Sequence, residues 1–485
     1  MYERERLYMG GNWVAPVEGG RIDVVSPSNE AVIGHVPLAS SADIERAVAA
    51  ARDAFDNGPW PRTTPEERAN ALARMGEYVT ERARELATLN IEEAAVPITF
   101  AHARELGPVA IFNFFTSLTR RFPFREIRQG AAAPALVVRE PVGVVAAVVP
   151  FNGPIMSAAA KIAPVIAAGC PIVFKPASET PLDVFVLAEA AEVAGIPAGV
   201  INIVPGDADL GAALVSHPGV DRVLFTGSTG AGRKIAEASA GSMKRLTLEL
   251  GGKAAAILLD DAPIEESLAA TLPMSFFNSG QACIALSRIL APRDHYDEVV
   301  DAAVAITEKM TLGDPHDADT VLGPVISARH RDRVESHIEA ARADGARIVL
   351  GGGRPAHLDR GWYVEPTIFR DVDNGMRLAQ EEVFGPVLAI IPHDGDADAV
   401  AIANDTRYGL SGAVFTPDLD RALDVASTIR VGTFGINGYV LDFSLPFGGR
   451  KQSGIGREFG VEGLAENTEV KAIALPAGTD ASALG

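Results

Sequence analysis

Residues 142 to 259 alternate short apolar runs with segments whose apolar residues recur every three or four positions. The apolar runs predict strands over residues 144–149, 171–174, 200–204, 222–225, 245–250 and 254–259. The segments between them predict helices over residues 155–168, 182–194 and 231–238, with a short helix after residue 208. This alternation is typical of a parallel sheet covered by helices on both faces, which binds ligands at the carboxyl ends of its strands.

The N-terminal region carries a different pattern. Short runs predict strands over residues 12–14 and 21–25, and a helix follows that Ser41 would cap. The apolar positions of that helix, at residues 44, 48, 51 and 55, recur at helical spacing. A single long helix is predicted over residues 66–89.

A second α/β series is predicted from residue 263 to about residue 438. Its predicted helices cover residues 264–278, 295–311 and 328–343, and its strands lie near residues 346–350 and 387–391. The last segment, residues 441–484, is glycine-rich and then strand-like over residues 470–475. Because it is short for a domain, we expect it to pack against another subunit.

Length and composition narrow the class of protein. The chain has 485 residues, which predicts about three structural units, and a net charge of −20, which argues against nucleic acid as a partner. Two cysteines, Cys170 and Cys283, cannot form a disulfide framework or a cysteine-rich zinc site, and we expect no metal. The N-terminus lacks the apolar segment of a secretory signal, and no apolar run reaches the ~20 residues that span a bilayer. These features predict a soluble cytoplasmic protein without membrane partners.

Cys283 is the first candidate for chemistry. It lies in residues 277–283 (FNSGQAC), where a long helical pattern ends, so we expect it on a tight turn among small neighbours. That setting favours a nucleophile, although a lone cysteine is often only a packing residue. Cys170, between a predicted helix and an apolar strand, fits the packing interpretation well.

Two polar residues follow predicted strands. Glu249 ends an apolar strand in residues 248–253 (LELGGK), where burial would raise its pKa toward that of a general base. The alternative for Glu249 is a surface carboxylate at a strand end. Asn152, in residues 150–154 (PFNGP), could donate to a developing oxyanion or could cap the helix that begins near Pro154.

Two loops could bind a nucleotide. Residues 227–232 (GSTGAG) follow a strand and open a helix, which is the setting of a phosphate-binding helix N-terminus, although the glycine order is not GxGxxG. A P-loop is excluded, because Ala254 follows Lys253 and no glycine precedes Gly252 by five residues. Residues 175–181 (KPASETP) also follow a strand, and Lys175 could bond ribose hydroxyls or remain a solvated cation.

Together these motifs resemble the NAD(P)-dependent aldehyde dehydrogenase superfamily, in order and spacing, over residues 10–475. The resemblance also includes residues 225–228 (FTGS), 280–283 (GQAC), 381–386 (EEVFGP), 446–449 (PFGG), Lys451 and residues 453–454. It implies an α/β fold with a Rossmann-type cofactor domain (residues 1–122 and 142–251), an α/β catalytic domain (residues 252–452) and a small β oligomerisation arm (residues 123–141 and 453–485). It also implies a homodimer or homotetramer.

The resemblance implies a mechanism of the non-acylating, hydrolytic type. Cys283 would attack the aldehyde carbon, and the Asn152 amide with the Cys283 backbone N–H would hold the oxyanion of the thiohemiacetal. After hydride transfer to the nicotinamide, Glu249 would activate water to hydrolyse the thioester. Glu458, in residues 456–458 (GRE), resembles a proton relay of some members and is equally open to a structural ion pair.

The cofactor contacts are also implied by the resemblance. Lys175 would contact the adenosine ribose, the helix that starts at Gly227 would face the pyrophosphate, and Glu382 with Phe384 would position the nicotinamide. The implied cofactor-binding set is Pro150, Phe151, Lys175, Ser178, Glu179, Gly227, Ser228, Gly232, Glu382 and Phe384. Many NAD-preferring members carry Glu where Ser178 stands, so we expect NAD⁺ with NADP⁺ use left open.

Further departures from the family concern the substrate. Phe151 replaces a common Trp, Gly153 and Gly435 replace bulky residues, and residues 94–97 (AAVP) differ from the usual segment. Phe112, Phe114 and Phe115 lie where the family lines its substrate tunnel. These residues predict a roomy tunnel for a medium or large apolar or aromatic aldehyde.

Two alternatives to a hydrolytic aldehyde dehydrogenase remain. One is a CoA-acylating dehydrogenase, which usually lacks the base at Glu249, and the other is a non-catalytic nucleotide-binding protein on the same fold.

Overall fold

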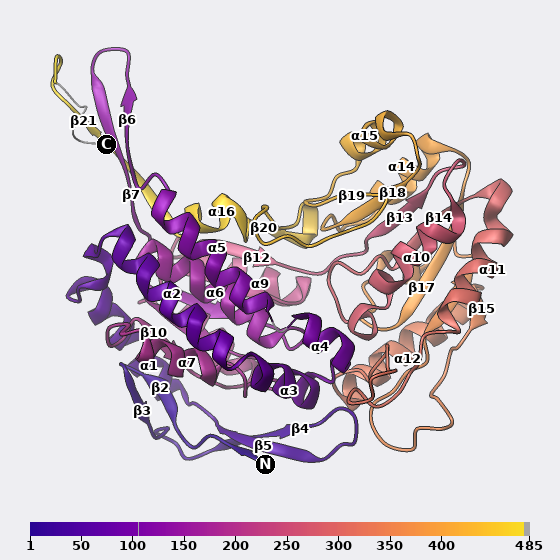
Figure 1. Cartoon of the computed structure of the whole chain (residues 1–485), viewed down its shortest axis with the longest axis horizontal. Helices are drawn as coiled ribbons and strands as arrows, with labels where there is room; N and C mark the ends of the chain where they lie inside the picture. The colour runs from indigo at the N-terminus through magenta and orange to yellow at the C-terminus, as the bar shows by residue number, and fades with distance from the viewer. Residues whose placement is uncertain (105, 480–485) are drawn as a thin grey trace.

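The computed structural model describes residues 1–104 and 106–479, which form two α/β halves side by side and a projecting β arm (Figure 1). The first half is built on an eight-stranded sheet in the order β20-β12-β11-β8-β9-β10-β2-β3. Its strands are β2 (Leu7–Met9), β3 (Asn12–Val14), β8 (Val145–Val148), β9 (Ile172–Lys175), β10 (Ile201–Ile203), β11 (Arg222–Thr226), β12 (Arg245–Glu249) and β20 (Gly454–Ile455). The five central strands, from β12 to β10, pair in parallel, whereas β2, β3 and β20 are antiparallel additions at the edges.

The central strands are apolar throughout because both faces of the sheet are covered. Val145 and Ala147 of β8 pack into a core with α2, α5, α6 and α7, whereas Val144 and Ala146 pack against α1, α8 and α9. The helices of this half are α1 (Ser41–Asp56), α2 (Pro65–Glu81), α3 (Ala83–Ala94), α4 (Ile98–Arg104), α5 (Gly107–Arg121), α6 (Pro154–Ala168), α7 (Phe185–Val193), α8 (Ala208–Ser216) and α9 (Thr229–Ala240).

The second half contains a seven-stranded sheet in the order β15-β16-β17-β14-β13-β18-β19, parallel except for the β15–β16 pair. Its strands are β13 (Ala255–Leu258), β14 (Arg288–Pro292), β15 (Arg347–Leu350), β16 (Thr367–Arg370), β17 (Val387–His393), β18 (Gly412–Phe415) and β19 (Gly435–Ile436). Its helices are α10 (Ile264–Ser275), α11 (Tyr296–Thr307), α12 (Ala328–Ala343), α13 (Arg377–Gln380), α14 (Asp396–Asn404) and α15 (Leu419–Thr428). The chain therefore crosses between the two sheets after Glu249, at the carboxyl end of β12.

The arm is a three-stranded antiparallel sheet in the order β21-β7-β6 that projects from the first half (Figure 1). It combines β6 (Arg125–Gln129) and β7 (Pro134–Pro141) with β21 (Thr468–Ala474) from the C-terminal segment, with Thr468 opposite Pro141. A fourth sheet, β1 (Tyr2–Glu3), β5 (Val32–Pro37) and β4 (Arg21–Val25), lies near the N-terminus.

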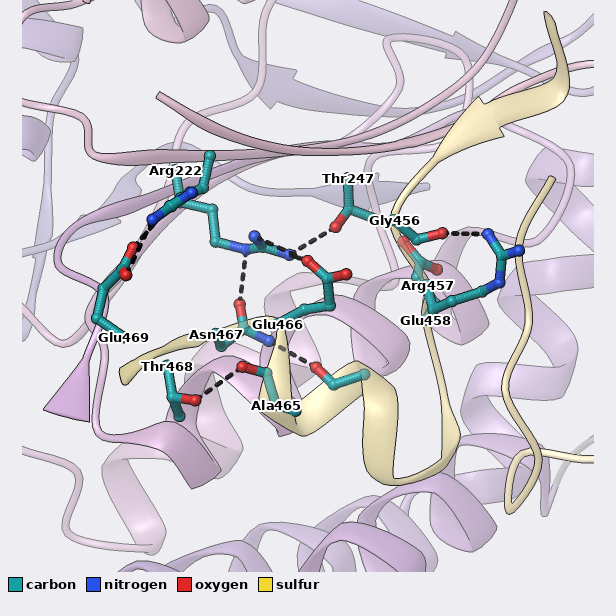
Figure 2. Close-up of polar contacts among 12 residues, drawn as sticks. Arg222, Thr247, Gly456, Arg457, Glu458, Ala465, Glu466, Asn467, Thr468 and Glu469 are labelled. Atoms are coloured by element: carbon teal, nitrogen blue, oxygen red, sulfur yellow. Dashed lines mark hydrogen bonds and ion pairs between the residues drawn. The ribbon is translucent and has the colours of Figure 1, made fainter. Parts of the chain in front are cut away.

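A network around Arg222 fastens the C-terminal segment to the first half (Figure 2). The buried Arg222 guanidinium donates from Nε to Asn467 Oδ1 at 3.1 Å and from Nη2 to Thr247 Oγ1 at 2.5 Å. On the exposed side, Arg245 donates to both carboxylate oxygens of Glu469 at 2.7 and 3.0 Å. The segment that contains α16 (Gly460–Ala465) is thus bonded to β11 and β12 directly.

Two local predictions were wrong. The side chain of Ser40, not that of Ser41, caps α1, and Ser40 and Asp43 form a reciprocal capping box. The single helix expected over residues 66–89 is two helices, because α2 ends at Glu81 and α3 begins at Ala83. Both helices bury an apolar face, so the apolar spacing alone did not reveal the break.

Candidate active site

Cys283 follows a turn with unusual backbone geometry. The turn lies in the short 3₁₀ segment η2 (Phe277–Gly280), where Asn278, Ser279 and Gly280 have φ values of 51°, 55° and 72°. A side chain at Gly280 would come within 2.0 Å of the Gly385 carbonyl oxygen, so only glycine fits. The Ser279 hydroxyl donates to the Gly323 carbonyl at 2.7 Å. This turn ends the helical region and places the half-buried Cys283 on the wall of a cavity.

Asn152 lies opposite this turn, on the loop between β8 and α6. Its Nδ2 donates to the Gln281 carbonyl at 2.8 Å, and Asn278 Nδ2 donates back to the Asn152 carbonyl at 3.3 Å. The alternative in which Asn152 caps α6 was wrong, because the N-cap is Gly153 and no side chain bonds there as a cap. The amide of Asn152 is therefore held against the cysteine turn.

Glu249 ends β12 inside the same cavity and is 3% exposed. Neither carboxylate oxygen has a hydrogen-bond partner among the described residues. Burial raises the pKa of Glu249 to about 8, and the nearby charges of Lys161 and Arg457 only partly offset this effect. A carboxyl group with such a pKa can exchange a proton near neutral pH, as a general base requires.

The thiol of Cys283 is protonated at rest. Burial raises its pKa to about 12, and the negative charges of Glu382 and Glu249 raise it further. The thiolate is the nucleophilic form, so the site needs a proton acceptor before Cys283 can attack. Glu249 is a carboxylate on the same cavity wall that can take this proton.

Glu458 is paired with Lys161, a residue that the sequence reasoning missed. Lys161 lies on α6, is 1% exposed, donates to Thr226 Oγ1 at 2.6 Å and forms an ion pair with Glu458. Burial lowers the pKa of Lys161 to about 7, while the charge of Glu249 opposes this shift. The signal in the sequence was a lysine within the mostly apolar run 155–168. Burial of an unpaired charge costs free energy, so such a lysine indicates a buried partner.

A second wall of the cavity carries the predicted nicotinamide contacts. Glu382 Oε1 accepts the N–H of Gly252 at 2.9 Å, and burial raises the pKa of Glu382 to about 7. Phe384 has a φ of 60°, and its carbonyl oxygen lies 2.6 Å from Nε2 of His330. The rings of Phe151, His330 and Phe384 pack edge to face with centroids 5.9 to 6.0 Å apart. His330 was not predicted from the sequence.

The other predicted cofactor residues lie at the carboxyl end of the first sheet. Pro150, Glu179, Gly227 and Ser228 line the cavity, and Ser228 caps α9 by accepting from the Ala231 N–H at 3.3 Å. The sequence-predicted nucleotide setting, a helix N-terminus after a strand, is therefore present and fits a dinucleotide phosphate.

Three members of the predicted cofactor set have other partners in this structure. The buried Lys175 donates from Nζ to the Pro176 carbonyl at 3.0 Å, and Ser178 Oγ donates to the Gly206 carbonyl at 2.9 Å. A Cβ at Gly232 would lie 2.5 Å from Leu250 Cδ2, so glycine there allows close packing of α9 on the sheet. Their cofactor contacts stay predictions.

The whole cavity has a volume of about 870 Å³, and its remaining lining is mostly apolar, with Arg329, Arg333, Ser157 and Ser327 as polar exceptions. Its apolar lining includes Phe100, Met156, Met274, Phe277, Phe443 and Phe459. Gly107 makes room for one of them, because a Cβ there would lie 2.3 Å from Met156 Sδ. A cavity of this size and lining is typical of a small-molecule site.

The predicted tunnel residues were partly wrong. Gly153 lines the cavity, but Phe112 and Phe115 are fully buried in the core beneath α5, and Phe114 packs against that core. Gly435 does not line the cavity either. A Cβ there would lie 1.8 Å from the Gly438 carbonyl oxygen, so this glycine allows close backbone packing. The aromatic lining comes instead from α4, η2 and the loops near residues 443 and 459.

Among the side chains of residues 1–101 and 106–479, no group of three or more is suited to hold a metal ion. Within the same residues, no helix is both long enough and apolar enough to cross a membrane. A half-buried thiol, a buried carboxyl group and a helix N-terminus that fits a phosphate lie on one cavity, an arrangement typical of a nucleotide-dependent enzyme with a covalent step.

Comparison with known proteins identifies the class more closely. The aldehyde dehydrogenase family model matches residues 13–473, and the chain belongs to this family. A geranial dehydrogenase of Castellaniella defragrans is 47% identical over 476 residues, which cover 98% of this chain and 99% of the relative. A 3-succinoylsemialdehyde-pyridine dehydrogenase of a Pseudomonas species is 40% identical over 477 residues, covering 98% and 99%.

Solved structures agree with this assignment. An aldehyde dehydrogenase of Mycobacterium tuberculosis in complex with NAD⁺ matches with a TM-score of 0.97 and 45% identity, over 99% of both chains. A variant of aldehyde dehydrogenase C of Pseudomonas syringae, in complex with NAD⁺ and octanal, matches with a TM-score of 0.95 and 40% identity, over 98% of both chains. The protein is thus an NAD-dependent aldehyde dehydrogenase that oxidises an aldehyde to the acid, as the resemblance implied.

Proposed function

We propose that Cys283, Asn152 and Glu249 carry out this oxidation on a medium or large apolar or aromatic aldehyde. The observation that supports the proposal is their convergence on one cavity whose remaining wall is mostly apolar. The names of two similar proteins point the same way, since one is a geranial dehydrogenase and another was solved with octanal. A short polar aldehyde would leave most of this wall uncovered.

The proposed first step is attack by Cys283. Glu249 accepts the thiol proton, and the sulfur forms a bond to the aldehyde carbon, which becomes a tetrahedral oxyanion. The Asn152 Nδ2 group and the Cys283 backbone N–H donate to this oxyanion, whose charge develops only as the bond forms. Bound NAD⁺ supplies the acceptor for the hydride that leaves the same carbon, and a thioester to Cys283 remains.

Hydrolysis completes the proposed cycle. Glu249 first releases the thiol proton through Lys161, which is paired with Glu458 and whose charge and that of Glu249 shift each other's pKa. The ionised Glu249 then takes a proton from water, the hydroxide adds to the thioester, and the bond to sulfur breaks to release the acid. The Cys283 thiolate takes this second proton back from Glu249, which restores the resting site. The presence of Glu249 supports water rather than CoA as the acceptor, and measuring acid against acyl-CoA product tests this choice.

A panel of aldehydes tests the substrate class. Acetaldehyde, succinic semialdehyde, octanal, geranial and benzaldehyde would each be assayed with NAD⁺ and NADP⁺ by the absorbance of the reduced cofactor. We expect the highest kcat/KM for the apolar aldehydes and for NAD⁺. Turnover confined to the short polar aldehydes, or a clear excess with NADP⁺, would contradict the corresponding part of the proposal.

Gly107→Ala sharpens the same test. The added Cβ would displace Met156 into the cavity, so kcat/KM should fall for geranial and octanal while that for acetaldehyde changes little. Equal effects on all aldehydes would show that this wall does not contact the substrate.

We also propose a homodimer or homotetramer that forms through the arm. The arm sheet has open edges at β21 and β6, and Val470 and Ile473 of β21 are 54% and 40% exposed. Light scattering of Val470→Lys should show a smaller assembly than the wild type.

A cytoplasmic location is proposed because a reducing compartment preserves the free thiol of Cys283, and cell fractionation tests it.

A further inference from the structure

The side chain of Gln281 is buried two residues before Cys283, and both of its polar atoms bond to the main chain. Gln281 is 1% exposed. Its Oε1 accepts the N–H of Ile326 at 2.9 Å, and its Nε2 donates to the Asn278 carbonyl at 3.1 Å. The Gln281 N–H donates to the same Asn278 carbonyl at 3.0 Å. This one side chain therefore joins the cysteine turn to the loop that precedes α12.

The cysteine turn depends on such bonds because its backbone is unfavourable. Asn278 and Ser279 adopt the left-handed conformation, which residues other than glycine keep only where surrounding contacts hold them. Asn278 is held by the two bonds from Gln281, and Ser279 by its hydroxyl bond to the Gly323 carbonyl. Removal of the Gln281 side chain would therefore loosen the turn at Asn278 and detach it from the N–H of Ile326.

The carbonyl of Gln281 orients the Asn152 amide. It accepts from Asn152 Nδ2 at 2.8 Å and, at a longer 3.5 Å, from Asn278 Nδ2. A carbonyl only accepts, so this bond requires Nδ2 rather than Oδ1 of Asn152 to face the cysteine turn. An amide nitrogen carries two hydrogens, so one N–H remains for an oxyanion. In the opposite orientation, Oδ1 would face the oxyanion and repel it.

We propose that Gln281 is a positioning residue for Asn152. Its side chain fixes the place of the Gln281 carbonyl, and that carbonyl orients the amide that stabilises the oxyanion. Gln281 acts through Asn152 rather than on the substrate, since it does not line the cavity whereas Ala282 and Cys283 do. The inference rests on the proposed role of Asn152. Because the oxyanion charge develops only in the transition state, the effect should appear in kcat.

Gln281→Met tests the role of the side chain, because methionine has a similar length and lacks both the amide donor and the amide acceptor. In the whole enzyme, kcat for the best aldehyde of the panel should fall by about 10²-fold through displacement of Asn152, with KM for NAD⁺ little changed. An unchanged kcat, or a loss confined to KM for NAD⁺, would overturn the positioning role.

Asn202→Leu is the matched control, because Asn202 is another buried amide that bonds to the main chain but does not line the cavity. On β10, its Oδ1 accepts the Gly10 N–H at 2.9 Å and its Nδ2 donates to the Gly199 carbonyl at 2.7 Å. This variant should be less stable in urea and keep the wild-type kcat. A fall in its kcat equal to that of Gln281→Met would assign both losses to general destabilisation and overturn the proposal.

A double-mutant cycle separates the role of Gln281 from that of Asn152. Asn152→Ala should lower kcat by about 10²–10³-fold. Adding Gln281→Met should lower it little further, because no amide remains to be positioned. A double variant slower by the product of the two single effects would overturn the positioning role alone. A wild-type kcat in Asn152→Ala would instead overturn the proposed function of Asn152, so the two failures are distinct.

Gln281→Glu decides the question if Gln281→Met does not fold. Glutamate has the same shape and an acceptor for the Ile326 N–H, and its protonated form can still donate to the Asn278 carbonyl. Burial raises the pKa of a carboxyl group, so kcat relative to wild type should fall as the pH rises from about 6 to about 9 and the donor is lost. This fall should disappear in the Asn152→Ala background. If it persists there, the new charge acts on Cys283 directly and the positioning role is overturned.

Discussion

Cys170 and Cys283 carry the same thiol group but lie in very different surroundings. Burial raises the pKa of Cys170 to about 11 and that of Cys283 to about 12, so neither is a resting thiolate. Cys170 is 0% exposed, follows α6, and its Sγ lies 3.4 Å from the Asn467 carbonyl. Cys283 faces a large cavity that also contains Asn152 and Glu249. Reactivity in this fold therefore depends on access and on a nearby base, and the resting pKa does not distinguish the two thiols.

The largest effect should come from Cys283→Ala. Loss of the nucleophile should lower kcat by about 10⁴-fold or more, as measured by NADH formation. In the native wild-type enzyme, iodoacetamide should label Cys283 alone, with labelling of Cys170 only after denaturation. Substantial NADH formation by Cys283→Ala would disprove the covalent mechanism.

Glu249→Gln should have the next largest effect. Removal of a general base should lower kcat by about 10²–10⁴-fold. Since the base must be ionised, the wild-type rate of thioester hydrolysis should rise with pH through about 8, and Glu249→Gln should lose this dependence. Because the pKa of Glu249 is raised from 4.5 to about 8, the wild type should also lose stability as the pH rises from about 4.5 to about 8, a loss that the variant should lack.

Stopped-flow and steady-state rates across pH 6–10 would check the Glu249 prediction. Glu308→Gln, at the exposed end of α11, is the control and should behave as wild type. A retained pH dependence in Glu249→Gln would assign the titration to another group.

We expect the buried ion pair between Lys161 and Glu458 to contribute more to the free energy of unfolding than to the catalytic rate. Lys161→Met leaves Glu458 without its cation and should lower the free energy of unfolding by about 3 kcal/mol or more. The double variant Lys161→Met/Glu458→Leu should recover much of this loss, because no charge then remains unpaired. Urea denaturation of the single and double variants measures the coupling, and simple additivity would contradict it.

Cys170→Ala should have the smallest effect. It removes a buried sulfur and should cost about 1–2 kcal/mol of stability with kcat unchanged. The raised pKa of Cys170 makes the wild type lose some stability as the pH rises from about 9 to about 11, and the variant should lack that loss. A fall in kcat similar to that of Cys283→Ala would remove the contrast between the two thiols.

The sequence predicted the sheets better than the cavity walls. Apolar runs such as residues 144–149 identified buried strands because burial on both faces leaves no polar position. The motif residues Cys283, Glu249 and Asn152 do meet at one cavity, because each lies at the carboxyl end of a strand or at a helix end. Phe112 was misplaced because an aromatic residue on a helix gives no sign of which neighbour it faces.

Other features depend on contacts distant in sequence. Lys161 meets Glu458 across almost 300 positions, so neither residue alone indicates the pair. His330 is bonded to Phe384, which has a positive φ that no local pattern in the sequence predicts. The domain boundaries stay a prediction, although the C-terminal segment pairs with both the first sheet and the arm.

The pairing of β20 with β12 places Gly454 opposite Glu249 and Ile455 opposite Leu248. The same segment continues through Glu458 and the Arg222 network into β21 (Figure 2). The strand that ends in Glu249 is thus completed by a segment that is synthesised much later than the strand itself. A nascent chain would contain Cys283 long before this edge closes, so a complete site forms only after residues 454 and 455 have been synthesised.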